Sequence, residues 1–211
     1  MFKDREQAGY LLAAKLQPFK GKQLVVLAIP RGGLPLGAII AESLNCPLDV
    51  ALSKKIGHPY NKEYAIGAAG LDGYFLNASE SIPQEYIEAE LNKIRSLLQE
   101  RSKLYHRKVA PKDLKNKWII IVDDGIATGN TVLLTAALVR KQQPIGIIVG
   151  TPVAPPGAIE ILNNSKDIDE IICLETPSNF RAVGQFYEDF DAVSDEEAVK
   201  ILENSAGNGI D

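Results

Sequence analysis

Cysteine, net positive charge and long apolar runs are all scarce in this sequence. Its 211 residues include two cysteines, Cys46 and Cys173, and these form no Cys-x-x-Cys spacing, so we expect neither a disulfide framework nor a zinc site. The formal net charge of −4 gives no general affinity for nucleic acid or an anionic membrane. No apolar stretch approaches the length of a membrane span, and the first residues are charged where a signal peptide needs an apolar run. We therefore expect a cytoplasmic protein that binds neither nucleic acid nor membrane.

Two common nucleotide-binding signatures are also missing. The P-loop pattern G-x-x-x-x-G-K-[ST] does not occur, because Gly21-Lys22 is followed by Gln23 and has no upstream glycine at the required spacing. The dinucleotide pattern G-x-G-x-x-G is absent as well. These absences exclude the usual P-loop nucleoside triphosphatases and dinucleotide-binding domains.

The sequence does contain strand-like runs that alternate with helix-like stretches. Continuous apolar runs at 24–29, 118–122, 145–149 and 170–174 suit strands that are buried on both faces, and helical patterns follow at 36–44, 131–141 and 158–163. This alternation predicts an α/β fold with a mainly parallel five-stranded sheet covered by helices. The segment between the halves differs: two short strands at 49–53 and 64–69 flank residues 54–63, which we expect to form a long, mobile loop, and a long helix covers about 83–107.

The strongest candidate site follows the run at 119–122. Asp123 and Asp124 emerge where the strand ends, which is the edge of an open α/β sheet at which ligands bind. Small and hydroxyl residues then lead into a helix, so backbone amides with the hydroxyls of Thr128 and Thr131 can hold a phosphate. The two carboxylates would repel that phosphate but suit the hydroxyls of an adjacent sugar, directly or through hydrated Mg²⁺. The pattern favours a ribose 5-phosphate site with both carboxylates facing solvent, although an acidic turn without function is an alternative interpretation.

Residues 119–131 resemble the signature by which type I phosphoribosyltransferases bind 5-phosphoribosyl-1-pyrophosphate (PRPP). Four apolar residues, two acidic residues and a run ending in Thr-Gly-x-Thr match it almost throughout. Residues 29–33 are similar to the loop by which that family binds pyrophosphate, and residues 54–63 fall where it carries a loop that closes over the substrates. The run 54–57, with Pro59, Glu63 and residues 65–68, is similar to a bacterial branch of the family whose acceptor is unassigned. The likeness covers most of 22–190.

The resemblance implies a single phosphoribosyltransferase-like domain at 1–203, with a small hood built from both termini and from the region 73–82, and a frayed tail at 204–211. It implies a homodimeric, Mg²⁺-dependent transferase that moves the phosphoribosyl group of PRPP to a nitrogen nucleophile, a nucleobase by preference, and releases pyrophosphate. PRPP would contact Arg31, Gly32, Gly33, Asp123, Asp124, Gly125, Ile126, Ala127, Thr128, Gly129, Asn130 and Thr131. The catalytic candidates are Asp123, Asp124, Arg31, Lys54, Lys55 and Glu63. Asp123 and Asp124 would hold the metal through water.

The sequence alone decides neither which acceptor the protein uses nor whether the site serves turnover or sensing. Family members that act on 6-oxopurines usually carry an Asp at the position matching Ala127, so Ala127 lowers the expectation for hypoxanthine, guanine or xanthine. The aromatic segment 175–190 offers a face on which a base could stack. Two other interpretations remain: a regulator that senses PRPP or a nucleotide without turnover, and an accessory domain of a hydrolase.

Overall fold

Short strands buried on both faces form the centre of the molecule. The structure is a computed structural model that describes residues 1–76 and 82–207. Five strands pair in the order β2-β1-β6-β7-β8, and every neighbouring pair is parallel. The strands are β1 Leu24–Ala28, β2 Leu48–Val50, β6 Trp118–Val122, β7 Gly146–Val153 and β8 Glu170–Glu175. The expected α/β fold with a five-stranded parallel sheet is confirmed.

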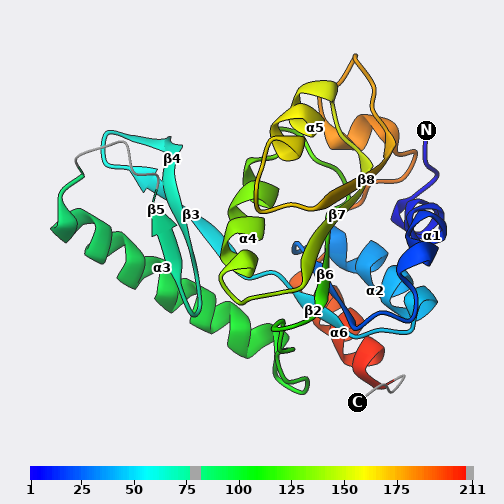
Figure 1. Ribbon diagram of the computed structural model, residues 1–211, viewed down its shortest axis with the longest axis horizontal. Helices are drawn as coiled ribbons and strands as arrows, with labels where there is room; N and C mark the ends of the chain where they lie inside the picture. The colour runs from blue at the N-terminus through cyan, green and yellow to red at the C-terminus, as the bar shows by residue number, and fades with distance from the viewer. Residues whose placement is uncertain (77–81, 208–211) are drawn as a thin grey trace.

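Helices cover both faces of this sheet (Figure 1). One face packs against the helices α1 Arg5–Leu16, α2 Gly33–Leu44 and α6 Asp195–Gly207, and the other against α4 Asn130–Arg140 and α5 Pro156–Asn163. Side chains alternate along each strand, so Val26 and Ile120 join the first core while Val25 and Ile119 join the second. The apolar runs in the sequence are continuous because each strand contributes to both cores.

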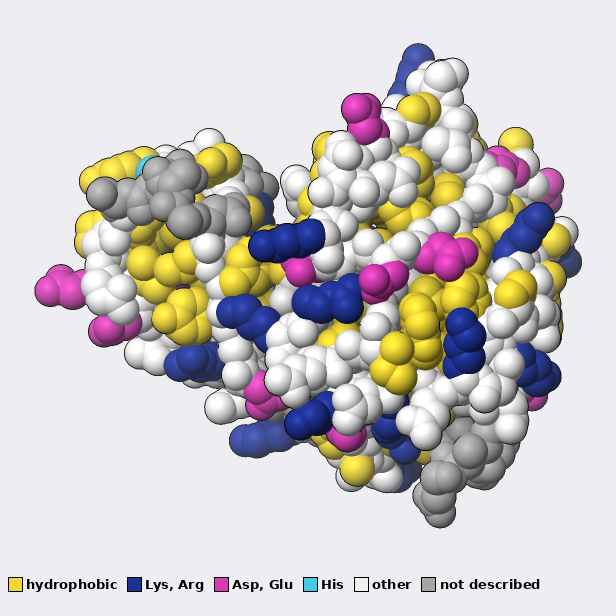
Figure 2. Space-filling model, in the orientation of Figure 1, with side chains coloured by type: hydrophobic (Ala, Val, Ile, Leu, Met, Phe, Trp, Pro, Cys, Tyr) yellow, Lys and Arg dark blue, Asp and Glu magenta, His cyan; other side chains and the backbone are white. Residues whose placement is uncertain are grey.

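A second, antiparallel sheet stands apart from the main one, at the left of Figure 1. Its strands are β3 Ser53–His58, β4 Asn61–Gly70 and β5 Tyr74–Leu76, and the helix α3 Gln84–Tyr105 lies along it. We call the described residues between 53 and 105 the small lobe and the rest the body. Ile56 and Ile66 pack against Leu91 and Ile94 in a core of the lobe's own. Figure 2 shows the lobe set off from the body by a notch, with basic and acidic side chains along their junction.

Three expectations need correction, about residues 54–63, the hood and the C-terminal tail. Residues 54–63 are not an irregular loop but the two arms of the β3–β4 hairpin, in which the turn formers Pro59 and Tyr60 occupy only the tip. The separate hood is built from the middle of the chain, since both terminal helices pack on α2 in the body. The tail is helical as far as Gly207; residues 208–211, and 77–81 of the expected hood, lie outside the described residues.

The lobe joins the body through the buried side chain of Tyr105 at the end of α3 and through polar contacts at α4. The hydroxyl oxygens of Ser53 and Thr135 lie 3.0 Å apart, and Lys141 Nζ donates to the carbonyl of Tyr74 at 2.5 Å. Successive side chains of a strand point to opposite faces, so Lys55 shares the face of Ser53, which is the face toward α4. Within the described residues, no helix combines the length and the apolar character that a membrane span requires.

Because the lobe has a core of its own, we expect it to lose stability separately from the body. Leu91→Ala removes a side chain that is 5% exposed, and such truncations cost about 2–5 kcal/mol. Hydrogen exchange should accelerate in β3, β4 and α3 and stay unchanged in β1 and β6. Asn92→Ala, an exposed neighbour on the same helix, is the control. Equal acceleration in both sheets would show that lobe and body unfold as one unit.

Candidate active site

Two loops meet at the edge of the main sheet where β1 and β6 end. The amide of Ile29 donates to the carbonyl of Val122 at 2.8 Å, which aligns the ends of the two strands. After the cis peptide between Pro30 and Arg31, the chain passes so close to β6 that a Cβ on Gly32 would lie 2.0 Å from Asp124 Oδ2. A Cβ on Gly33 would lie 2.5 Å from the carbonyl oxygen of Val122. Only glycine fits at these two positions, and the structure brings residues 31–33 and 123–124 together.

The two carboxylates have different environments, contrary to the expectation that both face solvent. Asp124 is buried, and its Oδ2 accepts a hydrogen bond from Arg5 Nε at 2.8 Å in an ion pair whose side chains are each 13% exposed. Asp123 is half-buried, and its Oδ1 accepts from the amide of Asp124 at 3.0 Å. Asp124 is therefore neutralised by a neighbouring cation, while Asp123 is the more exposed carboxylate at the end of the strand.

The environment of Asp123 disfavours its ionised form in the free protein. Burial raises the pKa of Asp123 well above its usual value, and the adjacent charge of Asp124 raises it further. A cation, or hydroxyl groups that donate hydrogen bonds to this carboxylate, would favour ionisation again. Perturbed acids of this kind concentrate at functional sites.

The loop that follows the carboxylates leads directly into α4. Gly129 has a φ of +80°, a conformation that glycine adopts without strain, and it precedes the first residue of the helix. The amide of Asn130 lies 3.4 Å from Thr128 Oγ1, and Thr128 and Thr131 are exposed, as is Ala127. Exposed hydroxyls beside the amides of a helix N-terminus form a cradle suited to a phosphate.

The basic candidates lie on different elements of the structure. Arg31 is exposed, and its Nη1 lies 3.6 Å from Asp195 Oδ1 at the start of α6, which is a weak surface pair. Lys54 and Lys55 both lie on β3, with Lys54 exposed and Lys55 on the face toward α4. Glu63 belongs to β4, but its side chain lies outside what the structure describes.

The sequence did not identify several residues that support the site. Besides Arg5, the hydroxyl of Tyr187 donates to the carbonyl of Asp124 at 2.6 Å, and Val183 covers Gly125 so closely that a Cβ there would lie 2.3 Å away. These residues come from the first turn of α1 and from the aromatic segment after β8. No local pattern indicated these contacts, because they join residues more than 50 positions apart.

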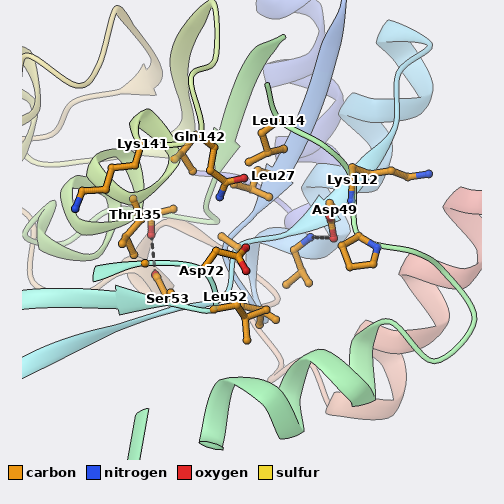
Figure 3. A pocket seen from close by; sticks show the side chains of 18 of the residues that line it. Leu27, Asp49, Leu52, Ser53, Asp72, Lys112, Leu114, Thr135, Lys141 and Gln142 are labelled. Carbon is orange, nitrogen blue, oxygen red and sulfur yellow. Dashed lines mark hydrogen bonds between the residues drawn. The ribbon is translucent and has the colours of Figure 1, made fainter. Parts of the chain in front are cut away.

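A separate pocket of about 300 Å³ opens between lobe and body, and Figure 3 shows it. Several polar groups in its wall contact one another. Asp49 accepts from His106 Nε2 at 2.8 Å and from the amide of Lys112 at 2.7 Å, and Ser53 contacts Thr135. His106 joins α3 to the edge strand β2 in this way, which is a structural role. Most of the remaining wall is apolar, and residues 31–33 and 123–131 do not contribute to it.

The acidic groups fit a hydrated metal ion better than a protein-built metal cage. Among the described residues, no group of three or more His, Cys, Asp or Glu side chains is placed to hold a metal. Asp123 and Asp124 are adjacent, but Asp124 already pairs with Arg5. Mg²⁺ commonly keeps its waters and binds one or two carboxylates together with substrate phosphates, and the residues present are compatible with that mode.

Comparisons with known proteins identify the family. The model of the phosphoribosyl transferase domain matches residues 7–191, and this chain belongs to that family. It is 35% identical over 210 residues to two Mycobacterium tuberculosis proteins, from strains CDC 1551 / Oshkosh and ATCC 25618 / H37Rv, that bear the provisional name of phosphoribosyl transferase. The match takes in 97% of this chain and 47% of theirs, so the chain spans about half the length of these relatives. The crystal structure of TT1426 from Thermus thermophilus is 36% identical, with a TM-score of 0.89 over 96% of this chain and 98% of that one.

The unequal environments of the two carboxylates lead to opposite expectations for stability. Asp124→Asn should lower the free energy of unfolding by about 3 kcal/mol, because it removes one charge of a buried pair. Asp123→Asn should leave Tm unchanged or raise it, because it removes a carboxylate whose charge the fold disfavours. Calorimetric melting at neutral pH checks both variants. A larger loss for Asp123→Asn than for Asp124→Asn would contradict this account.

Proposed function

We propose that this chain transfers the phosphoribosyl group of PRPP to a nitrogen nucleophile and releases pyrophosphate. The observation that supports this proposal most directly is the arrangement of residues at the end of β6. A half-buried carboxylate, Asp123, lies between the hydroxyl-lined loop that opens α4 and the glycine-rich loop that follows β1. Membership of the phosphoribosyl transferase domain family supports the same conclusion.

Each part of the site suits one part of PRPP. The amides of residues 127–131, with Thr128 and Thr131, would bind the 5-phosphate, because the amide of Ile126 already donates to the carbonyl of Val153. Asp123 would accept hydrogen bonds from the ribose hydroxyls. Arg31 and the amide of Gly32 would bind the pyrophosphate, and Arg31 would give up its weak contact with Asp195 to do so. The amide of Gly33 donates to the carbonyl of Ile29 at 3.0 Å, so Gly33 would contribute by its close approach rather than as a donor. Mg²⁺, held through water near Asp123 and Asp124, would neutralise charge on the pyrophosphate.

The reaction breaks the bond between C1 of the ribose and the pyrophosphate oxygen, and a nitrogen lone pair forms the new bond to C1. Positive charge develops on the ribose ring while the leaving group gains negative charge, so groups placed in advance to meet both charges lower the barrier. Asp123 lies on the ribose side, and Arg31 on the leaving-group side. Lys55, on the strand face toward α4, is the candidate for additional positive charge, with Lys54 beside it. The lobe that carries them would help to exclude water from the ribose cation.

A direct test is a set of acceptors offered with PRPP and Mg²⁺, with pyrophosphate release as the readout. We expect turnover with at least one nitrogen acceptor, and Asp123→Asn should lower kcat/KM by about 10²-fold or more, since such electrostatic contacts are typically worth that much. Lys15→Gln, an exposed change on α1, is the control. Tight PRPP binding without turnover on any acceptor would instead favour a PRPP-sensing regulator, and no PRPP binding would refute the proposal.

The residue at position 127 sets an expectation for the acceptor. Ala127 is exposed at the loop and can neither donate nor accept a proton, whereas a general acid or base typically contributes about 10²–10⁴-fold in rate. We expect poor use of hypoxanthine, guanine and xanthine, and better use of adenine, a pyrimidine or another amine. Steady-state kinetics on these bases decides the matter, and kcat/KM for a 6-oxopurine at or above about 10⁴ M⁻¹s⁻¹ would contradict it.

A further inference from the structure

The guanidinium of Arg5 is fixed by three separate contacts. Its Nε donates to Asp124 Oδ2 at 2.8 Å, and its Nη1 donates to the carbonyl of Asp191 at 2.7 Å. Its central carbon lies 3.9 Å from the centroid of the Phe190 ring, in a cation–π contact. These contacts, together with the 13% exposure of the side chain, hold the cation in one place. Lysine has no planar fork and could keep only part of this arrangement.

Asp124 is fixed on its backbone side as well. The hydroxyl of Tyr187 donates to its carbonyl oxygen at 2.6 Å, and burial raises the pKa of Tyr187, so this hydroxyl keeps its proton. The Tyr187 ring packs against Phe2 and Phe190, with ring centroids 5.5 and 4.9 Å away. The start of the chain and the segment 187–191 therefore both hold Asp124, one at its carboxylate and the other at its backbone carbonyl.

These contacts affect the groups that would meet the ligand. A Cβ on Gly32 would overlap the Asp124 carboxylate, so a displacement of that carboxylate toward the loop 31–33 would collide with it. The backbone of Asp124 also carries the amide that holds Asp123 Oδ1. With Arg5 in place, an anionic ligand meets one uncompensated carboxylate; without it, the ligand would meet two.

We propose that Arg5 is a positioning residue for the PRPP site. It holds and neutralises Asp124, and through Asp124 it fixes Asp123 and the loop 31–33 in the geometry that binds the ligand. This inference rests on the proposed function and deepens it, because it divides the acidic pair into a ligand-facing member, Asp123, and a supporting member, Asp124. The division predicts a dependence of PRPP affinity on α1, a helix that contributes no ligand contact of its own to the proposed binding mode.

The first experiment measures PRPP affinity by calorimetry in the presence of Mg²⁺. Arg5→Met keeps the length of the side chain and removes its charge, and we expect it to weaken PRPP binding by about 10-fold or more, as outer supporting residues typically do. Arg5→Lys should recover part of that loss and bind PRPP more tightly than Arg5→Met, because it restores the charge beside Asp124 but not the planar fork. Lys15→Met, with the same chemical change on an exposed position of the same helix, should bind like the wild type.

A double-mutant cycle separates action through Asp124 from a general effect on folding. In an Asp124→Asn background, Arg5→Met should change PRPP affinity by less than about twofold, because the contact through which it acts is already lost. Full additivity of the two changes would overturn the inference. So would an Arg5→Met protein that folds and binds PRPP as the wild type does.

Hydrogen exchange on the free protein gives an answer that does not require PRPP. The amides of Asp123 and Ile126 are bonded to the carbonyls of Gly150 and Val153, so these two amides should exchange slowly in the wild type. They should exchange faster in Arg5→Met and as slowly as wild type in Lys15→Met; unchanged exchange in Arg5→Met overturns the positioning role. Failure of the wild type to bind PRPP would refute the proposed function instead, and Arg5→Lys supplies the comparison should Arg5→Met fail to fold.

Discussion

The ion pair between Arg5 and Asp124 joins two parts of this molecule that lie 119 positions apart in sequence. It connects the first turn of α1 to the end of β6, and Asp124 in turn contacts the loop after β1 and the segment near Tyr187. A buried carboxylate is tolerated only with such a partner, because desolvation of an isolated charge is strongly unfavourable. The same interaction therefore stabilises the fold and determines which of the two adjacent acids is available to a ligand.

The body holds the candidate site on fixed strands, whereas the lobe has a core of its own. Strands β1 and β6 are almost completely buried and have a core on each face, so the loops at their ends start from fixed points. The lobe built from β3, β4, β5 and α3 has its own core, and it meets the body through the contact of Ser53 with Thr135 of α4 and through Tyr105, which is buried in the core of the body. The phosphate cradle lies on the body, and the lysines lie on the lobe. Ligand binding would then depend on the body and water exclusion on the lobe.

The sequence was sufficient to predict the main sheet and the place of the candidate site. Runs such as 118–122 are apolar at every position, which is typical of a parallel strand covered on both faces, and the acids after it had to lie at the ligand-binding edge. The hairpin at 53–70 was missed because Gly57, Pro59 and three lysines are typical of a loop. The lysines in fact lie on β3 and β4, and the pairing of these two strands decides the conformation of the segment. Arg5 was missed, and Tyr187 was expected only as part of a segment on which a base could stack, because their partner Asp124 lies 119 and 63 residues away and no local pattern carries that information.

The central claim is that the end of β6 binds the ribose phosphate of PRPP, and a crystal structure with PRPP and Mg²⁺ tests it most directly. The account predicts the 5-phosphate against the amides of 127–131, the ribose hydroxyls at Asp123, the pyrophosphate at 31–33, and the Arg5–Asp124 pair unbroken. A ligand bound instead in the pocket between lobe and body, or ribose hydroxyls held by Asp124 after release of Arg5, would contradict it.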